Sequence, residues 1–119
     1  MKYLVDSDWV IDYLRGKDEA VNLLAGMTDE GIAISILTFG EVYQGILFGR
    51  DREHHERVFR NFMRAADVLT LNRSIMRRFA EIRGTLRMQG QTLDVPDLLI
   101  AATAIYYNLT LVTRNLTDF

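Results

Sequence analysis

The sequence predicts an α/β domain of three layers (α/β/α), with helices on both faces of a central, mainly parallel sheet of four to five strands. Short apolar runs that end at polar or turn residues recur along the chain, as buried strands do. Longer segments with apolar residues three and four positions apart, which are typical of helices, lie between them. Strands that alternate with helices pair in parallel through right-handed crossovers. With 119 residues, we expect one domain over residues 1–119.

The first half of the chain contains two expected strands. Tyr3–Val5 is an apolar run that stops at Asp6, and Ser7 and Asp8 can cap the helix expected next, which ends near Gly16. A second helix is expected over Asp18–Met27, followed by a polar turn and the buried strand Ile32–Ser35. A helix over 38–49 completes this half.

The second half predicts three helices and two further strands. A helix over 53–66 precedes a strand over 68–71, and the long helix Arg73–Met88 follows. The next helix, over 94–108, is apolar on most of its surface, which predicts burial on most sides. Its start carries an aspartate that can cap a first-turn amide and a proline that the first turn tolerates. A short apolar strand over 110–113 comes last.

Composition excludes several classes of protein. The chain has no cysteine, so neither a disulfide framework nor a thiolate metal site is possible. No stretch resembles a signal peptide or a membrane span, so we expect a cytosolic protein. The net charge is −2, yet residues 50–90 hold ten arginines against five acidic residues. This surplus either pairs with glutamates on a solvated helix or binds phosphate groups.

Asp6, Glu41 and Asn115 are expected to meet at one edge of the sheet, and Asp97 joins them if its helix points its first turn that way. Asp6 follows the first strand, Glu41 begins the helix after the second, and Asp97 lies in the first turn of the buried helix. In such sheets, ligands bind beyond the carboxyl ends of the strands. Two carboxylates about 4 Å apart repel by about 4 kcal/mol at an effective dielectric of 20, so protons or a cation must compensate. Oxygen ligands favour Mg²⁺ or Mn²⁺, which would activate a water for attack on a phosphoryl group.

Glu41 and Asp97 also have a simpler explanation as residues that cap their helices. Thr38 and Glu41 match the S/T-x-x-E capping box, in which the glutamate bonds back to the threonine amide. Asp97 and Asp94 together can complement the positive end of a helix dipole. We also expect Asp8 to act as a cap.

The segments YLVDSD, SILTFGE and DLLIAATA followed by LTLVTRN resemble the PIN domain, most closely the VapC-type toxins of bacterial toxin–antitoxin pairs. The resemblance covers essentially the whole chain. It implies a Mg²⁺- or Mn²⁺-dependent endoribonuclease that is cytoplasmic, forms a homodimer and is inhibited by a cognate VapB-like antitoxin. It also implies that Asp6, Glu41 and Asp97 are the catalytic and metal-binding acids. Thr38, Thr113, Asn115 and Asp118 are expected to support them.

The sequence departs from this pattern near its end. Many PIN domains carry a fourth acid after the last strand, where this chain has Asn115, and either Asp94 or Asp118 could supply it. The family usually continues into another strand after the Asp-Phe pair that ends here at Phe119. We therefore expect that a C-terminal edge strand is missing and that a partner or a dimer mate covers the exposed edge near Val112.

Two other functions fit the sequence. The chain could be a non-catalytic domain of the same fold whose arginine-rich helices bind RNA or protein, with the acids serving as caps. It could also be a phosphatase that uses Asp6 of the pair Asp6 and Asp8 as a nucleophile. Loss of RNA cleavage in Asp6→Asn, with the fold retained, separates the nuclease from the binding domain, and a phosphorylated Asp6 would indicate the phosphatase.

Overall fold

The computed structural model describes residues 1–114, which contain four strands and six α-helices. In chain order the elements are β1 (Tyr3–Val5), α1 (Ser7–Leu14), α2 (Asp18–Met27), the short 3₁₀ helix η1 (Thr28–Glu30), β2 (Ile32–Ser35), α3 (Ile36–Leu47), α4 (Arg52–Phe62), β3 (Ala66–Leu69), α5 (Arg73–Met88), α6 (Val95–Tyr107) and β4 (Thr110–Val112).

The four strands form one parallel sheet in the order β3-β2-β1-β4. The predicted α/β class and the parallel sheet are therefore confirmed. The first three strands are added in one direction, and the chain then crosses over so that β4 pairs with the opposite side of β1. The order in which strands are added therefore reverses between β1 and β4. Parallel sheets bind ligands at such a point, beyond the carboxyl ends of the strands.

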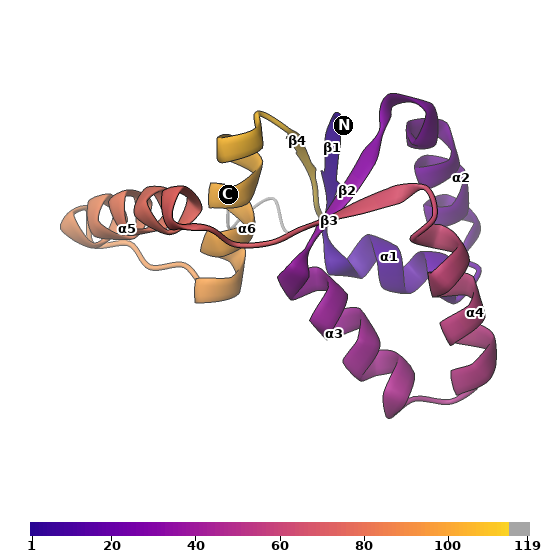
Figure 1. Cartoon of the computed structure of the whole chain (residues 1–119). Helices are drawn as coiled ribbons and strands as arrows, with labels where there is room; N and C mark the ends of the chain where they lie inside the picture. Colours follow the sequence, from indigo (N-terminus) through magenta and orange to yellow (C-terminus); the bar gives the residue numbers. More distant parts are fainter. Residues whose placement is uncertain (115–119) are drawn as a thin grey trace.

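Helices cover both faces of the sheet, as Figure 1 shows: α5 and α6 lie on one side, and α1 to α4 on the other. Successive strand residues pack against different helix layers, because their side chains point to opposite faces of the sheet. Leu4 packs in a cluster with Ile100 of α6, whereas its neighbour Val5 packs with residues of α1 to α4. Ile100 and Leu4 are almost fully buried.

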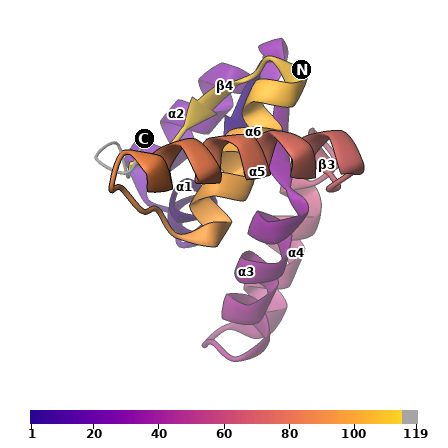
Figure 2. The same cartoon turned by 90° about the vertical axis from the view of Figure 1, so that its left-hand side faces the viewer.

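Two pairs of helices pack against each other, one pair on each side of the sheet (Figure 2). Helix α5 crosses α6, and Phe79 of α5 packs in one buried cluster with Leu99 and Ala102 of α6. On the other side, α3 and α4 run next to each other. The ring of Phe59 on α4 lies 5.7 Å from that of Phe39 and 5.4 Å from that of Tyr43, both on α3. Such aromatic pairs stabilise the contact between the two helices.

Several predicted boundaries were wrong, including those of α3 and α4 and of β3, which was predicted over 68–71 and spans Ala66–Leu69. Helix α3 begins at Ile36, because the hydroxyl oxygen of Ser35 accepts a hydrogen bond from the Leu37 amide at 3.1 Å and caps the helix there. Helix α4 ends at Phe62 instead of continuing to residue 66, since Ala66 already pairs with Ile32 in the sheet. Sheet pairing therefore overrides the helical pattern that the sequence continues past this point.

The predicted domain, 1–119 with a missing edge strand, stays a prediction because the structure describes residues 1–114. The predicted site residues Asn115 and Asp118 lie outside the described residues. No helix among residues 1–114 combines the length and apolar character needed to cross a lipid bilayer.

Candidate active site

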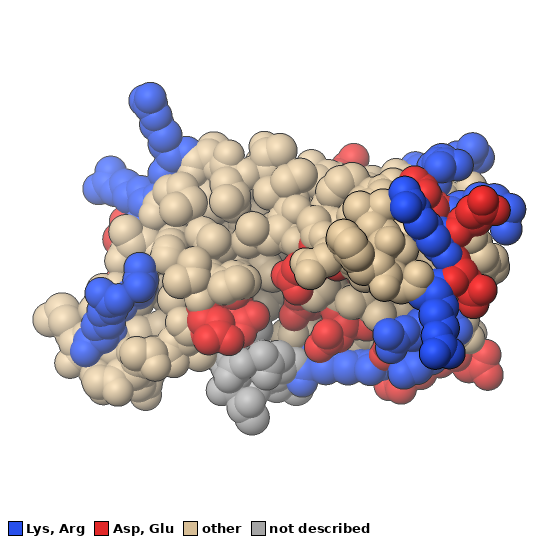
Figure 3. All heavy atoms as spheres, turned by 90° about the horizontal axis from the view of Figure 1, so that it is seen from below, with Lys and Arg blue, Asp and Glu red and all other residues tan. Residues whose placement is uncertain are grey.

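Three elements bring acidic residues to one cavity beyond the carboxyl ends of the strands. Asp6 directly follows β1, Glu41 lies on α3, and Asp97 lies in the first turn of α6. Figure 3 views this end of the molecule, where acidic side chains lie in the middle of the face and, at its right-hand end, further acidic side chains alternate with basic ones. The cavity has a volume of about 300 Å³ and is lined by Asp6, Ser7, Asp8, Glu41, Asp94, Pro96 and Asp97.

Asp6 is buried and firmly held. Its backbone N–H donates to the carbonyl oxygen of Val112 at 2.9 Å, which ties the end of β1 to β4. Its carboxylate Oδ1 accepts from the Ser7 amide at 2.8 Å, and Oδ2 accepts from the Thr113 hydroxyl at 2.9 Å. Asp6 is only 7% exposed, so these bonds fix the direction of its carboxylate.

Ser7 connects Asp6 to Glu41, which is 35 residues further along the chain than Asp6. The Ser7 hydroxyl lies 3.3 Å from Oε2 of Glu41 and 3.5 Å from Oδ1 of Asp6. Because a hydroxyl carries one hydrogen, it donates to one of these oxygens at a time. The sequence predicted Ser7 only as a helix cap. Its position between a strand and a helix, next to an aspartate, is the signal that could have identified it.

The pKa of the Glu41 carboxyl group is affected by the other acids of the cavity. Partial burial raises its pKa above the usual value for glutamate, and the negative charges of Asp6, Asp8 and Asp97 raise it further. The hydrogen bond from Ser7 acts in the opposite direction. The three predicted acids therefore interact electrostatically. The capping box predicted for Glu41 was wrong, because α3 begins two residues before Thr38.

The remaining predicted caps also differ from expectation. Asp94 occupies the N-cap position of α6, but its side chain makes no capping hydrogen bond, and it lines the cavity instead. The N-cap position of α1 belongs to Asp6, so Asp8 lies in the first turn, exposed and at the cavity.

The two described supporting residues have different positions. Thr113 contacts Asp6 directly. Thr38 is fully buried within α3, and its hydroxyl has no hydrogen-bond partner among residues 1–114. It does not line the cavity.

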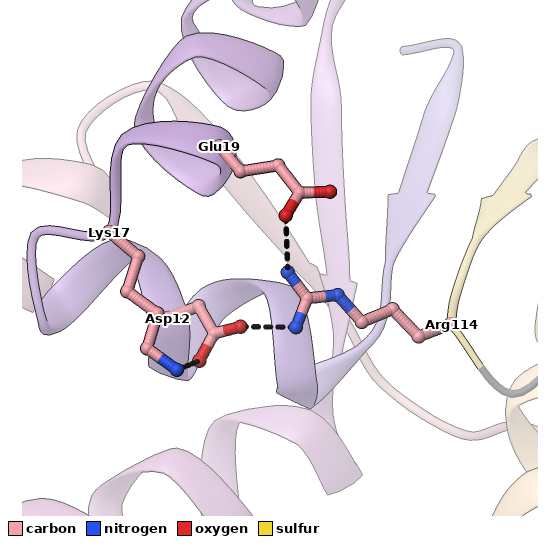
Figure 4. Close-up of polar contacts among 4 residues, drawn as sticks. All are labelled: Asp12, Lys17, Glu19 and Arg114. Carbon is pink, nitrogen blue, oxygen red and sulfur yellow. Dashed lines mark hydrogen bonds and ion pairs between the residues drawn. The ribbon is translucent and has the colours of Figure 1, made fainter.

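Arg114 contacts three residues of the adjacent helices, and no pattern in the sequence indicated this (Figure 4). Its guanidinium donates to the buried carboxylate of Asp12 on α1 and lies 3.8 Å from the Glu19 carboxylate on α2. It also lies over the ring of Trp9, 4.0 Å from the ring centre. Lys17 pairs with the other oxygen of Asp12 at 3.2 Å.

The cavity suits a divalent cation by charge and by donor type. It is lined by five carboxylates, which are hard oxygen ligands of the kind that Mg²⁺ and Mn²⁺ prefer. Asp6 and Glu41 already share a hydrogen-bonding partner in Ser7. In the described part of the chain, however, no three Asp, Glu or His side chains are arranged as a ready ligand set.

Comparison with protein families gives a match to the PIN domain over residues 3–117. Ribonuclease VapC1 of Methanocaldococcus jannaschii is 34% identical over 119 residues, which cover 99% of this chain and 79% of that protein. Ribonuclease VapC19 of Mycobacterium tuberculosis is 31% identical over 118 residues, covering 98% of this chain and 90% of that protein.

Solved structures give the same result. A toxin–antitoxin complex from Klebsiella pneumoniae matches with a TM-score of 0.78 and 29% identity, covering 99% of this chain and 90% of that one. The VapBC2 complex of Rickettsia felis, bound to a DNA fragment from its promoter, matches with a TM-score of 0.87 and 25% identity, covering 98% and 90%.

Proposed function

The chain belongs to the PIN domain family and is a ribonuclease of the VapC toxin type, and we propose that Asp6, Glu41 and Asp97 form its metal-dependent catalytic centre. The observation that carries this proposal is the shared cavity: three acids from three distant elements line it at the point where the sheet changes direction. Carboxylates that repel one another destabilise the fold. Their convergence in one cavity therefore favours a functional role for them. The non-catalytic and phosphatase alternatives find no support among the relatives.

The proposed reaction is hydrolysis of an internal RNA phosphodiester by in-line attack of water. Asp6, Glu41 and Asp97 would hold Mg²⁺ or Mn²⁺, which when bound lowers the pKa of water and neutralises charge on the phosphoryl group. Ser7 and Thr113 keep the Asp6 carboxylate in one direction through their hydrogen bonds. Asp94 and Asp8 add negative charge around the same cavity.

The proposed partners follow from the same assignment. The substrate is cytoplasmic RNA, and the exposed arginines of α4 and α5 are suited to its phosphates. A cognate VapB-like antitoxin would inhibit the enzyme, as the toxin–antitoxin complexes among the structural relatives suggest. We further propose that the active form is a homodimer.

The function is tested by incubating purified protein with total RNA, with and without Mg²⁺, and mapping the cut ends by sequencing. Asp6→Asn should lower cleavage by at least about 100-fold, since it removes one ligand charge from the centre. Asp29→Asn, in the exposed helix η1, is the matched control and should cleave like the unaltered protein. Equal cleavage by the Asp6 and Asp29 variants would contradict the proposal.

A further inference from the structure

Arg114 and Thr113 are adjacent in sequence but reach two different places. Thr113 turns toward Asp6, and its hydroxyl donates to Oδ2 of that residue at 2.9 Å. Arg114 points to the other side, onto α1 and α2, as Figure 4 shows for its contacts with Asp12 and Glu19. The chain just after β4 is therefore held on one side by an ion pair and bonded on the other to the predicted catalytic aspartate.

The Arg114 contacts have the features of a rigid anchor. Asp12 is only 5% exposed, whereas the Arg114 side chain is 38% exposed, so the carboxylate end of the pair is shielded from solvent and the guanidinium end is only partly so. The guanidinium also contacts the Trp9 ring, at 4.0 Å from the ring centre. The planar guanidinium of Arg114 contacts a carboxylate and an aromatic ring at the same time, which restricts its motion. A lysine at this position could not make both contacts in the same way.

We propose that Arg114 is a positioning residue, which anchors the end of β4 on α1 and thereby holds the Thr113 hydroxyl against the carboxylate of Asp6. This role rests on the proposed function, because Asp6 must take part in cleavage for its orientation to matter. Arg114 acts through Thr113 and does not line the cavity of the acids. Its loss should therefore reduce the rate of cleavage and leave RNA binding unchanged.

The test is a double-mutant cycle on the full chain with Arg114→Ala, Thr113→Val and both together. Each single change should lower kcat by about 10-fold with KM unchanged, the usual effect of removing an outer partner of a functional carboxylate. The double variant should lose no more than the worse single one, because both changes break the same connection. Additive losses in kcat, or a raised KM with kcat unchanged, would overturn the proposal.

The fluorescence of Trp9 gives a readout that does not depend on activity. Trp9 is the sole tryptophan of the sequence, so its emission reports on the guanidinium above its ring. Arg114→Ala and Arg114→Lys should both change this emission, whereas Arg15→Lys, an exposed arginine just beyond α1, should not. Unchanged emission in both Arg114 variants would show that the anchor does not exist.

Two controls separate the possible failures. Arg114→Lys keeps the charge and provides a milder variant if Arg114→Ala does not fold, and it should lose kcat with melting temperature nearly retained. Asp6→Asn is assayed in parallel. If the unaltered protein does not cleave RNA, the proposed function fails and the positioning role fails with it. If cleavage depends on Asp6 but not on Arg114, only the positioning role is refuted.

Discussion

The ionised carboxyl group of Glu41 destabilises the folded protein, and we attribute its presence to a role in catalysis. Its pKa is raised by partial burial and by three neighbouring acids, so the folded protein holds the Glu41 proton more tightly than the unfolded chain does. A group with a raised pKa stabilises the fold at low pH, and this contribution is lost as the pH rises through its folded pKa. At neutral pH, ionised Glu41 is therefore a source of instability.

Glu41→Gln should consequently make the protein more stable and inactive. Glu41 is only partly buried and keeps much of its surface in contact with solvent, which limits the gain at pH 7 to about 0.5 kcal/mol, or about 2 °C in melting temperature. RNA cleavage should fall by at least about 100-fold. Thermal unfolding at pH 7 and pH 4 measures the gain, which should vanish at pH 4. Glu53→Gln, an exposed glutamate of α4, is the control, and a Glu41→Gln variant less stable than the unaltered protein would refute this explanation.

Cleavage itself should weaken on acidification. Protonation of Glu41 removes a negative charge from the cavity, and because its pKa is raised this happens at a higher pH than for an ordinary glutamate. Single-turnover rates measured from pH 8 to pH 5 at a fixed Mg²⁺ concentration well below saturation, where protons compete with the ion for the carboxylates, should fall toward the acid end. A flat profile would contradict the involvement of these carboxylates.

At the scale of elements, α6 is the helix that places Asp97, and its burial sets the stability of the site. Ile100 is 2% exposed and contacts the sheet, whereas Ile105 of the same helix is 50% exposed. Ile100→Ala should destabilise the protein by about 2–5 kcal/mol through the lost burial and the cavity left behind. Ile105→Ala should change it by less than about 0.5 kcal/mol. Urea unfolding of the two variants makes the comparison, and equal effects would contradict the described packing.

Helix α1 is attached to its surroundings through Asp12. Burial alone would raise the pKa of Asp12, but the hydrogen bond and charge of Lys17, followed by those of Arg114, lower it. A lowered pKa gives stability that is present above the unfolded pKa and lost as the pH falls through the folded one.

Asp12→Asn should accordingly destabilise the protein by about 1.5–3 kcal/mol at pH 7, the usual value for a hydrogen bond to a charged group. The difference should begin to shrink below about pH 4, where the carboxyl group of the unfolded chain becomes protonated while that of the folded protein is still ionised. Denaturant unfolding at pH 7 and pH 3.5 tests this, with Asp18→Asn as the exposed control. A difference that is the same at both pH values would refute the role of the charge.

The elements could be predicted where a single pattern decides them. The nearly uniform apolar surface of α6, with Pro96 in its first turn, predicted the helix and the position of Asp97. The start of β3 could not be predicted, because its residues also continue the helical pattern of α4 and only pairing with β2 decides between the two.

The site residues differ in the same way. Glu41 fitted both a capping box and an acidic cluster, and only the start of α3 at Ile36 separates these interpretations. The contacts of Ser7 with Glu41 and of Arg114 with Asp12 join residues 34 and 102 positions apart. Contacts over such separations depend on the assembled fold, and short motifs in one sequence carry no record of them.

For the whole molecule, a divalent ion that binds only the folded state must stabilise it. Titration with Mg²⁺ should raise the melting temperature, and at 100 times the dissociation constant the gain is about 2.7 kcal/mol. Asp97→Asn should abolish most of this shift, while the exposed Asp67→Asn on β3 should retain it. A shift that survives in the Asp97 variant would place the ion elsewhere.

The central claim is that Asp6, Glu41 and Asp97 together bind a divalent metal ion. Anomalous diffraction from crystals soaked in Mn²⁺, at a concentration that supports cleavage, tests it most directly. We expect one strong manganese peak in the cavity, within coordination distance of Asp6, Glu41 and Asp97. A well-ordered cavity with no peak, or a peak bound to other residues, would contradict it.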